Sequence, residues 1–223
     1  MKYLRQVWAV IAKDMAAEMH TREILSAMAV FAVLALLIFS FTLDLRGSAG
    51  RAAAPGVLWA TIAFAGTLGL SRSMAREQQT GGMEGLLLAP IERTAIFFGK
   101  AVGNLILMLL MEVVLLPLGT ALLDAPLLRL PVLPVLVLGT AGYAVIGTLL
   151  AAIAVHTRAR EVLLPILLLP LAVPLLLAAV RATEGIIAGV PFAEIAGWVR
   201  LLGAYDLIMI AIALVTFDAV VEE

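Results

Sequence analysis

The sequence has no cysteine, two histidines and few charged residues. Without cysteine, disulfides, thiolate metal sites and covalent haem attachment through a Cys-x-x-Cys-His motif are excluded. The histidines, His20 and His156, are too few for a zinc site with several ligands. The net charge of −1 at pH 7 gives no electrostatic basis for a nucleic-acid partner.

Apolar side chains are what the sequence has in excess. Hydrophobic residues make up 63% of the 223 residues, charged residues make up 14%, and the mean hydropathy is +1.11. A soluble domain would be about half apolar and about a quarter charged. The excess predicts a polytopic, all-α membrane protein that interacts with the lipid bilayer along most of its length.

Six segments are long and apolar enough, or nearly so, to cross a hydrocarbon core that needs about 20 helical residues. They are residues 24–43, 52–71, 101–123, 130–155, 162–180 and 201–221. The whole chain, 1–223, is therefore predicted to be a single transmembrane domain. An even number of spans places both termini on the same side of the membrane.

The distribution of lysine and arginine predicts which side that is. With the N-terminus in the cytoplasm, ten basic residues lie on the inner side and five on the outer side. The positive-inside rule therefore predicts that the N-terminus and the C-terminus lie in the cytoplasm. Both histidines then lie on the cytoplasmic side, where neither can supply an axial haem ligand on the outer face.

Two segments outside the spans are predicted to lie on the membrane surface. Residues 1–22 contain apolar side chains at helical spacing, which predicts an interfacial helix with Trp8 at headgroup depth. The alternative is a solvated helix that leads into the first span. The outer loop 181–200 is apolar but interrupted by acids, glycine and proline, and is expected to fold back as one or two short helices.

The loop 72–100, predicted to be cytoplasmic, contains the stretch GGMEGLLLAP. Gly81 and Gly82 let the chain turn, and a short helix is expected to end near Ala89, before Pro90. An acid in the first turn, Glu84, suits the helix dipole. The three leucines of this helix need a cover, either the protein's own spans or a groove on a partner subunit. The partner would contact the helix at Gly81, Gly82, Glu84, Leu86, Leu87 and Leu88.

The chain has no nucleotide-binding motor of its own. Gly99 and Lys100 are its one Gly-Lys pair, but Thr94 stands where a P-loop needs its first glycine. Energy for transport would come from another subunit or from an ion gradient. The chain is therefore expected not to be an enzyme.

Gradient coupling usually leaves several ionisable residues inside the bilayer. Two acids lie within the predicted spans, Glu112 at mid-span and Asp206 about five residues inside the last one. Glu112 either has a transport role or forms a hydrogen bond that joins two helices or two subunits. Asp206 is expected to reach the outer interface as a satisfied acid. Without a relay between them, these acids are weak support for a gradient-driven transporter.

Three prolines lie within the fifth predicted span, in the sequence LLPILLLPLAVPLLL. Pro165, Pro170 and Pro174 each remove a backbone hydrogen bond and can bend a helix. They are candidates for shaping this span, although packing alone could explain them.

Three stretches, APGVLWATIAFAGTLGLSRSMARE, GGMEGLLLAPIERTAIFFGKAVGNL and VLLPILLLPLAVPLLLAAV, resemble the CcmB family of haem exporter permeases, as does the ending DAVVEE. The resemblance covers nearly the whole chain. It implies an ABC-2-type (type V exporter-like) permease of the bacterial inner membrane with an interfacial N-terminal helix, and a role in c-type cytochrome maturation. It also implies that the short helix between spans two and three is a coupling helix, through which a soluble ATPase acts on the spans. It also implies a CcmA-like ATPase that carries ATP, a second permease copy, and CcmC-, CcmD- and CcmE-like partners that handle haem.

In this interpretation haem is the cargo, and the chain itself holds no cofactor or metal. Whether haem crosses through this subunit is left open by its residues. The nearest alternative is an ABC-2 export permease for a lipid, drug or glycan. A gradient-driven transporter that uses Glu112 and a non-transporting membrane scaffold are the others.

Overall fold

The computed structural model describes residues 2–43, 47–82, 85–86, 89–154 and 160–222. This part of the chain is helical and contains no strand. Its helices are α1 (Lys2–Thr21), α2 (Glu23–Thr42), α3 (Gly47–Thr80), α5 (Arg93–Leu122), α6 (Val132–Ala154), α7 (Arg160–Ala188) and α8 (Phe192–Glu222). Apart from α1, each is long and apolar enough to cross a membrane, so the all-α fold with six candidate spans is confirmed.

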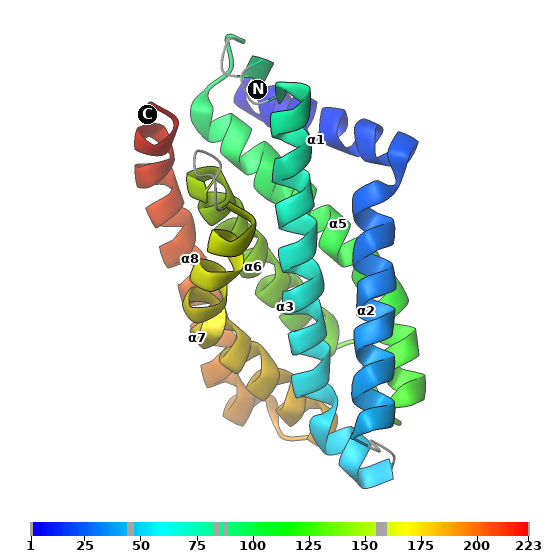
Figure 1. The fold of residues 1–223 in the computed structure, drawn as a ribbon. Helices are drawn as coiled ribbons and strands as arrows, with labels where there is room; N and C mark the ends of the chain where they lie inside the picture. The colour runs from blue at the N-terminus through cyan, green and yellow to red at the C-terminus, as the bar shows by residue number, and fades with distance from the viewer. Residues whose placement is uncertain (1, 44–46, 83–84, 87–88, 155–159, 223) are drawn as a thin grey trace.

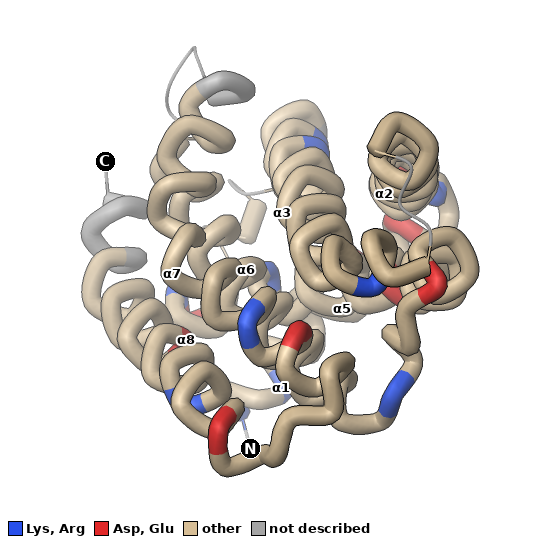
Figure 2. Tube along the Cα trace, turned by 90° about the horizontal axis from the view of Figure 1, so that it is seen from below, with Lys and Arg blue, Asp and Glu red and all other residues tan. Residues whose placement is uncertain are grey.

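The six long helices form a bundle, and α1 lies across one end of it (Figure 1). Both termini lie at this end, which we call the α1 end. Figure 2, seen from the opposite end, shows few charged residues along most of each helix. On α2, the outward side chains Val30, Leu34, Ile38 and Phe41 are each more than half exposed. Such a stripe suits contact with lipid chains rather than with water.

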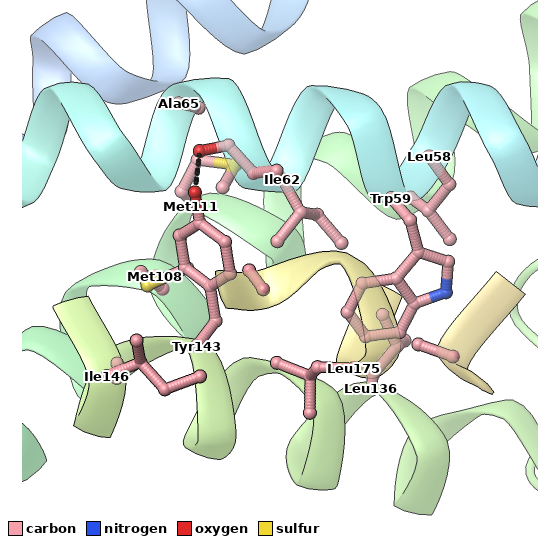
Figure 3. Close-up of a cluster of buried hydrophobic side chains, with 14 of the residues drawn as sticks. Leu58, Trp59, Ile62, Ala65, Met108, Met111, Leu136, Tyr143, Ile146 and Leu175 are labelled. Atoms are coloured by element: carbon pink, nitrogen blue, oxygen red, sulfur yellow. Dashed lines mark hydrogen bonds between the residues drawn. The ribbon is translucent and has the colours of Figure 1, made fainter. Parts of the chain in front are cut away.

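Helix α6 lies in the interior of the bundle and packs against α3, α5, α7 and α8. Glycine allows this close approach. A Cβ atom added at Gly139 would lie 2.3 Å from the Trp59 ring, and one added at Gly147 would lie 2.2 Å from Leu70. Figure 3 shows Trp59 and Tyr143 within the buried cluster that α3 and α6 form with their neighbours. Small residues at such crossings are typical of helices packed in membranes.

Hydrogen bonds add to this packing. The Trp59 indole donates to the Thr183 hydroxyl on α7 at 3.0 Å. The hydroxyl groups of Tyr143 and Thr67 lie 2.7 Å apart and join α6 to α3. The Asn104 amide on α5 donates to the Thr148 hydroxyl on α6 at 2.9 Å. Each of these bonds joins two helices through buried side chains, where an unpaired polar group would be costly.

The region 181–200 differs from its expected structure. Separate short helices were expected, but residues 181–188 continue α7 and residues 192–200 begin α8. The break between them falls at Gly189, whose φ of 77° suits glycine, and is followed by Pro191. The acid Glu184 does not interrupt α7 because it is exposed and pairs with Arg181 one turn earlier, at 2.9 Å.

The three prolines lie inside α7, which continues through all of them. A proline ring crowds the preceding turn, so carbonyl groups there lose helical partners. The Tyr205 hydroxyl on α8 donates to the Leu171 carbonyl, three residues before Pro174. This bond ties α8 to the part of α7 that the prolines disturb.

Candidate functional site

Four charged residues from three helices meet at the α1 end of the bundle. Lys100 on α5 donates to both carboxylate oxygens of Asp14 on α1, at 3.0 and 2.8 Å, and also to Glu77 on α3. Lys13 on α1 donates to the same Glu77 oxygen at 2.9 Å, and its Nζ lies 3.2 Å from Asp14 Oδ1. We call Lys13, Asp14, Glu77 and Lys100 the ion cluster.

The ion cluster has a buried centre, and its charges balance, although Lys13 at its edge is 41% exposed. The Lys100 side chain is 4% exposed and that of Glu77 is 10% exposed. Burial lowers the pKa of Lys13, but the hydrogen bond to Glu77 and the charges of Asp14 and Glu77 outweigh it, so the pKa lies above its usual value. Lys13 therefore stabilises the fold at pH values below the ordinary lysine pKa, and this contribution is lost only as the pH rises through the raised pKa.

A second set of polar contacts holds the corner between α1 and α2. Arg76 on α3 contacts the Glu18 carboxylate at 3.3 Å and donates to the Ala17 carbonyl at 3.0 Å. The other Glu18 oxygen accepts the backbone N–H of Leu25, in the first turn of α2, at 2.8 Å. The chain turns at Arg22, whose φ is 52°. These contacts fix α1 across the bundle.

A cavity of about 310 Å³ lies beside both sets of contacts. Charged side chains from α1, α3 and α5 line it, and so do Asn104 and Gly82. Gly82 belongs to the predicted partner-binding stretch. The cavity therefore places that stretch next to the ion cluster.

The predicted coupling helix lies partly outside the described residues, which omit Glu84, Leu87 and Leu88. Gly81 has a φ of 63°, and Gly82 and Leu86 are helical. The Gly85 N–H donates to the Gly81 carbonyl at 3.1 Å, as in a helical turn. The Gln6 amide of α1 lies 3.4 Å from the Pro90 carbonyl. We call residues 81–90 the coupling segment.

Both ends of the coupling segment are joined to α1. Glu77 lies four residues before Gly81, and Lys100 lies ten residues after Pro90. Both bind α1 through the ion cluster. The sequence analysis did not predict this cluster. A signal was present, because Glu77 and Lys100 lie at the ends of two successive spans that one loop connects.

Glu112 lies elsewhere, in the middle of the bundle. It is 3% exposed, and its Oε1 accepts a hydrogen bond of 2.6 Å from Thr140 on α6. The sequence left two alternatives for Glu112, a transport role or a hydrogen bond between helices. This contact corresponds to the second, because it joins α5 to α6.

Asp206 lies further inside its helix than the sequence suggested. Helix α8 begins at Phe192 rather than at residue 201, so Asp206 is 14 residues inside it, about 21 Å at 1.5 Å per residue. Its side chain is 8% exposed, and Oδ1 has no hydrogen-bond partner among the described residues. A Cβ atom at Gly142 on α6 would lie 2.1 Å from this oxygen. The expectation that Asp206 is a satisfied acid is therefore not met at Oδ1, and its position at the outer interface stays a prediction.

The chain matches the family described as CcmB protein over residues 5–223. It is 34% identical over 172 residues to the heme exporter protein B of Rhodobacter capsulatus, covering 75% of this chain and 79% of the relative. It is 26% identical over 186 residues to the heme exporter protein B of Pseudomonas aeruginosa, covering 83% of each. With nearly its whole length matched, the chain belongs to the CcmB family.

Proposed function

We propose that the protein is the membrane permease subunit of an ABC transporter that exports or delivers haem for c-type cytochrome maturation. The cargo follows from the name that two relatives carry, heme exporter protein B. ATP binds to a separate CcmA-like subunit, because the sequence has no P-loop. The chain itself is not an enzyme and binds no cofactor of its own.

The ion cluster is the observation that supports this function most. It joins α1, α3 and α5 around the coupling segment. A force that the ATPase applies to the coupling segment would therefore move these helices together rather than bend one loop. Separating Lys100 from its partners would leave uncompensated buried charges, so the cluster keeps the three helices joined.

The complete transporter contains two copies of this chain, the ATPase, and CcmC-, CcmD- and CcmE-like partners. The α1 end, with both termini, faces the cytoplasm of the inner membrane, where the ATPase has access to ATP. Seven basic residues on the described helix ends and connections near α1 support this orientation, and they are Lys2, Arg5, Lys13, Arg22, Arg72, Arg76 and Lys100.

The experiment uses the purified complex of the permease and its ATPase in lipid. Replacing Glu84 with Arg, or Leu87 with Asp, should abolish the stimulation of ATP hydrolysis by the permease while the spans remain inserted. Glu194→Arg is the matched control, because Glu194 is exposed in the first turn of α8. Normal stimulation in both coupling-segment variants would show that the ATPase docks elsewhere.

A further inference from the structure

A groove runs along the outward face of α3, away from the ion cluster. Helices α2 and α7 both pack against α3, which lies between them in Figure 1. The groove has a volume of about 640 Å³, within the usual range for small-molecule sites. None of the described residues of the coupling segment lines it.

The lining of the groove changes character along α3. Phe64 and Leu68 form its floor toward the middle of the bundle, whereas Arg72 and Gln79 form it toward the α1 end. From Phe64 to Gln79 the helix rises about 22 Å, at 1.5 Å for each of 15 residues. Phe31 on α2 is a further apolar residue of the wall. The acid Glu23 on α2 also lines the second end. The groove is thus apolar at one end and charged at the other, where two arginines outnumber one acid.

The apolar part of the groove opens on the lipid-facing side of the bundle. Phe31 is 39% exposed and Phe64 is 45% exposed. Among the described residues both rings are left partly uncovered, so in a membrane they lie against hydrocarbon. An acyl chain can therefore enter the groove from the side.

The charged part has an arginine that is available to an anion. The Arg72 side chain is 44% exposed, and among the described residues its charged contact is Glu23, at 3.6 Å. Glu23 is itself 68% exposed, so this pair is weak. Arg76 lines the groove as well, but its guanidinium binds Glu18 and the Ala17 carbonyl. Arg72 is thus the side chain that would meet an anionic group.

We propose that this groove binds an anionic phospholipid, with its phosphate on Arg72 and an acyl chain along Phe64 and Leu68. The guanidinium fork matches a phosphate group in geometry and charge. The lipid comes from the leaflet at the α1 end, where headgroups lie at the depth of Arg72. This assignment depends neither on the cargo nor on the partner ATPase.

The test measures lipid retention by native mass spectrometry. Purified protein is given equal amounts of phosphatidylglycerol and phosphatidylcholine with identical acyl chains. Both lipids carry a phosphate, but in phosphatidylcholine the choline ammonium cancels its charge and would lie near Arg72. The unaltered protein should therefore retain phosphatidylglycerol with a preference of about tenfold, which corresponds to about 1.4 kcal/mol. Arg72→Ala should reduce this preference to about one.

Two further variants keep the result interpretable. Ala75→Phe fills the groove without changing its charge and should reduce retention of both lipids. Arg51→Ala is the matched control, because Arg51 is an exposed arginine whose ion pair, with Asp124, lies far from the groove residues in sequence. It should leave the preference unchanged. A thermal unfolding curve for each variant confirms that it is folded.

Two results would overturn the assignment. One is equal retention of the two lipids by the unaltered protein, or a preference that survives both Arg72→Ala and Ala75→Phe. The other is displacement of phosphatidylglycerol from the unaltered protein by an equimolar iron porphyrin, whose propionates could also bind Arg72. The groove would then hold a porphyrin rather than a lipid.

Discussion

The α1 end and the centre of the bundle are held together in different ways. At the α1 end, four charged residues from three helices form the ion cluster, with Lys100 and Glu77 buried at its centre. In the centre, glycines of α6 accept bulky side chains such as Trp59 and Leu70. Charge pairs stabilise the α1 end, whereas complementary packing of side chains against glycines stabilises the centre.

This difference separates two roles. A packed glycine crossing has one low-energy arrangement, because any shift brings atoms into collision. An ion cluster can exchange partners when a neighbouring segment moves, since each lysine contacts two carboxylates. The α1 end is therefore suited to receive a mechanical signal, and the centre is suited to transmit it without deforming.

The largest effect is expected from Lys100→Met. Removing one partner of a buried ion pair leaves an uncompensated charge and costs about 3–5 kcal/mol. The free energy of unfolding in detergent should fall by this amount. The double variant Lys100→Met, Glu77→Gln should recover part of the loss, because Lys13 and Asp14 remain as a neutral pair. A single variant that unfolds like the unaltered protein would refute the role of the cluster.

A smaller loss is expected from Gly139→Ala. The added methyl group would lie 2.3 Å from the Trp59 ring, and such overpacking costs about 1–3 kcal/mol. Gly197→Ala is the control, since a Cβ atom there meets no neighbour within 4 Å. It should be neutral or slightly stabilising, because alanine favours a helix. The melting temperature of Gly139→Ala should therefore fall, while that of Gly197→Ala stays the same or rises slightly. Equal shifts in the two variants would contradict close packing at α6.

A still smaller loss is expected from Thr140→Val, which removes the hydrogen bond to Glu112. Bonds between membrane helices are worth about 0.6 kcal/mol on average and at most about 1.7. Glu112→Gln keeps an acceptor oxygen and should change stability less, with transport retained. Transport that stops in Glu112→Gln but continues without ATP would instead favour a gradient-driven mechanism.

The smallest effect is expected from Arg51→Ala. Its ion pair with Asp124 is 3.0 Å long, but both side chains are about 60% exposed. Exposed pairs contribute about 0–1 kcal/mol. The free energy of unfolding should fall by no more than this amount. A loss as large as that of Lys100→Met would mean that burial does not set the strength of the ion cluster.

The sequence predicted the elements of the fold better than their ends. Hydrophobic runs are long enough to identify the six candidate spans, because a bilayer requires about 20 apolar residues. Helix ends are less certain, because polar residues can continue a helix beyond the bilayer. Thus α3 extends to Thr80, and α8 begins at Phe192.

The ion cluster could not be predicted in the same way. Its members lie on three helices, and their meeting depends on how α1 crosses α3 and α5. Individually, Asp14 and Glu77 resemble ordinary solvated acids. Asp206 was placed too near the start of its helix for a simpler reason, because the position of a residue within a helix follows from where that helix begins. The coupling segment was proposed from its own glycines and leucines, which are adjacent in sequence, and its role stays a prediction.

The central claim is that this permease works with a separate ATPase in haem handling. The most direct measurement purifies the tagged protein from its own membranes in mild detergent, identifies co-purifying subunits by mass spectrometry, and records the Soret absorbance of haem. We predict a Walker-motif ATPase together with a haem-carrying partner. Finding no ATPase, under conditions that keep other membrane complexes intact, would contradict the claim and leave the coupling segment as an ordinary loop.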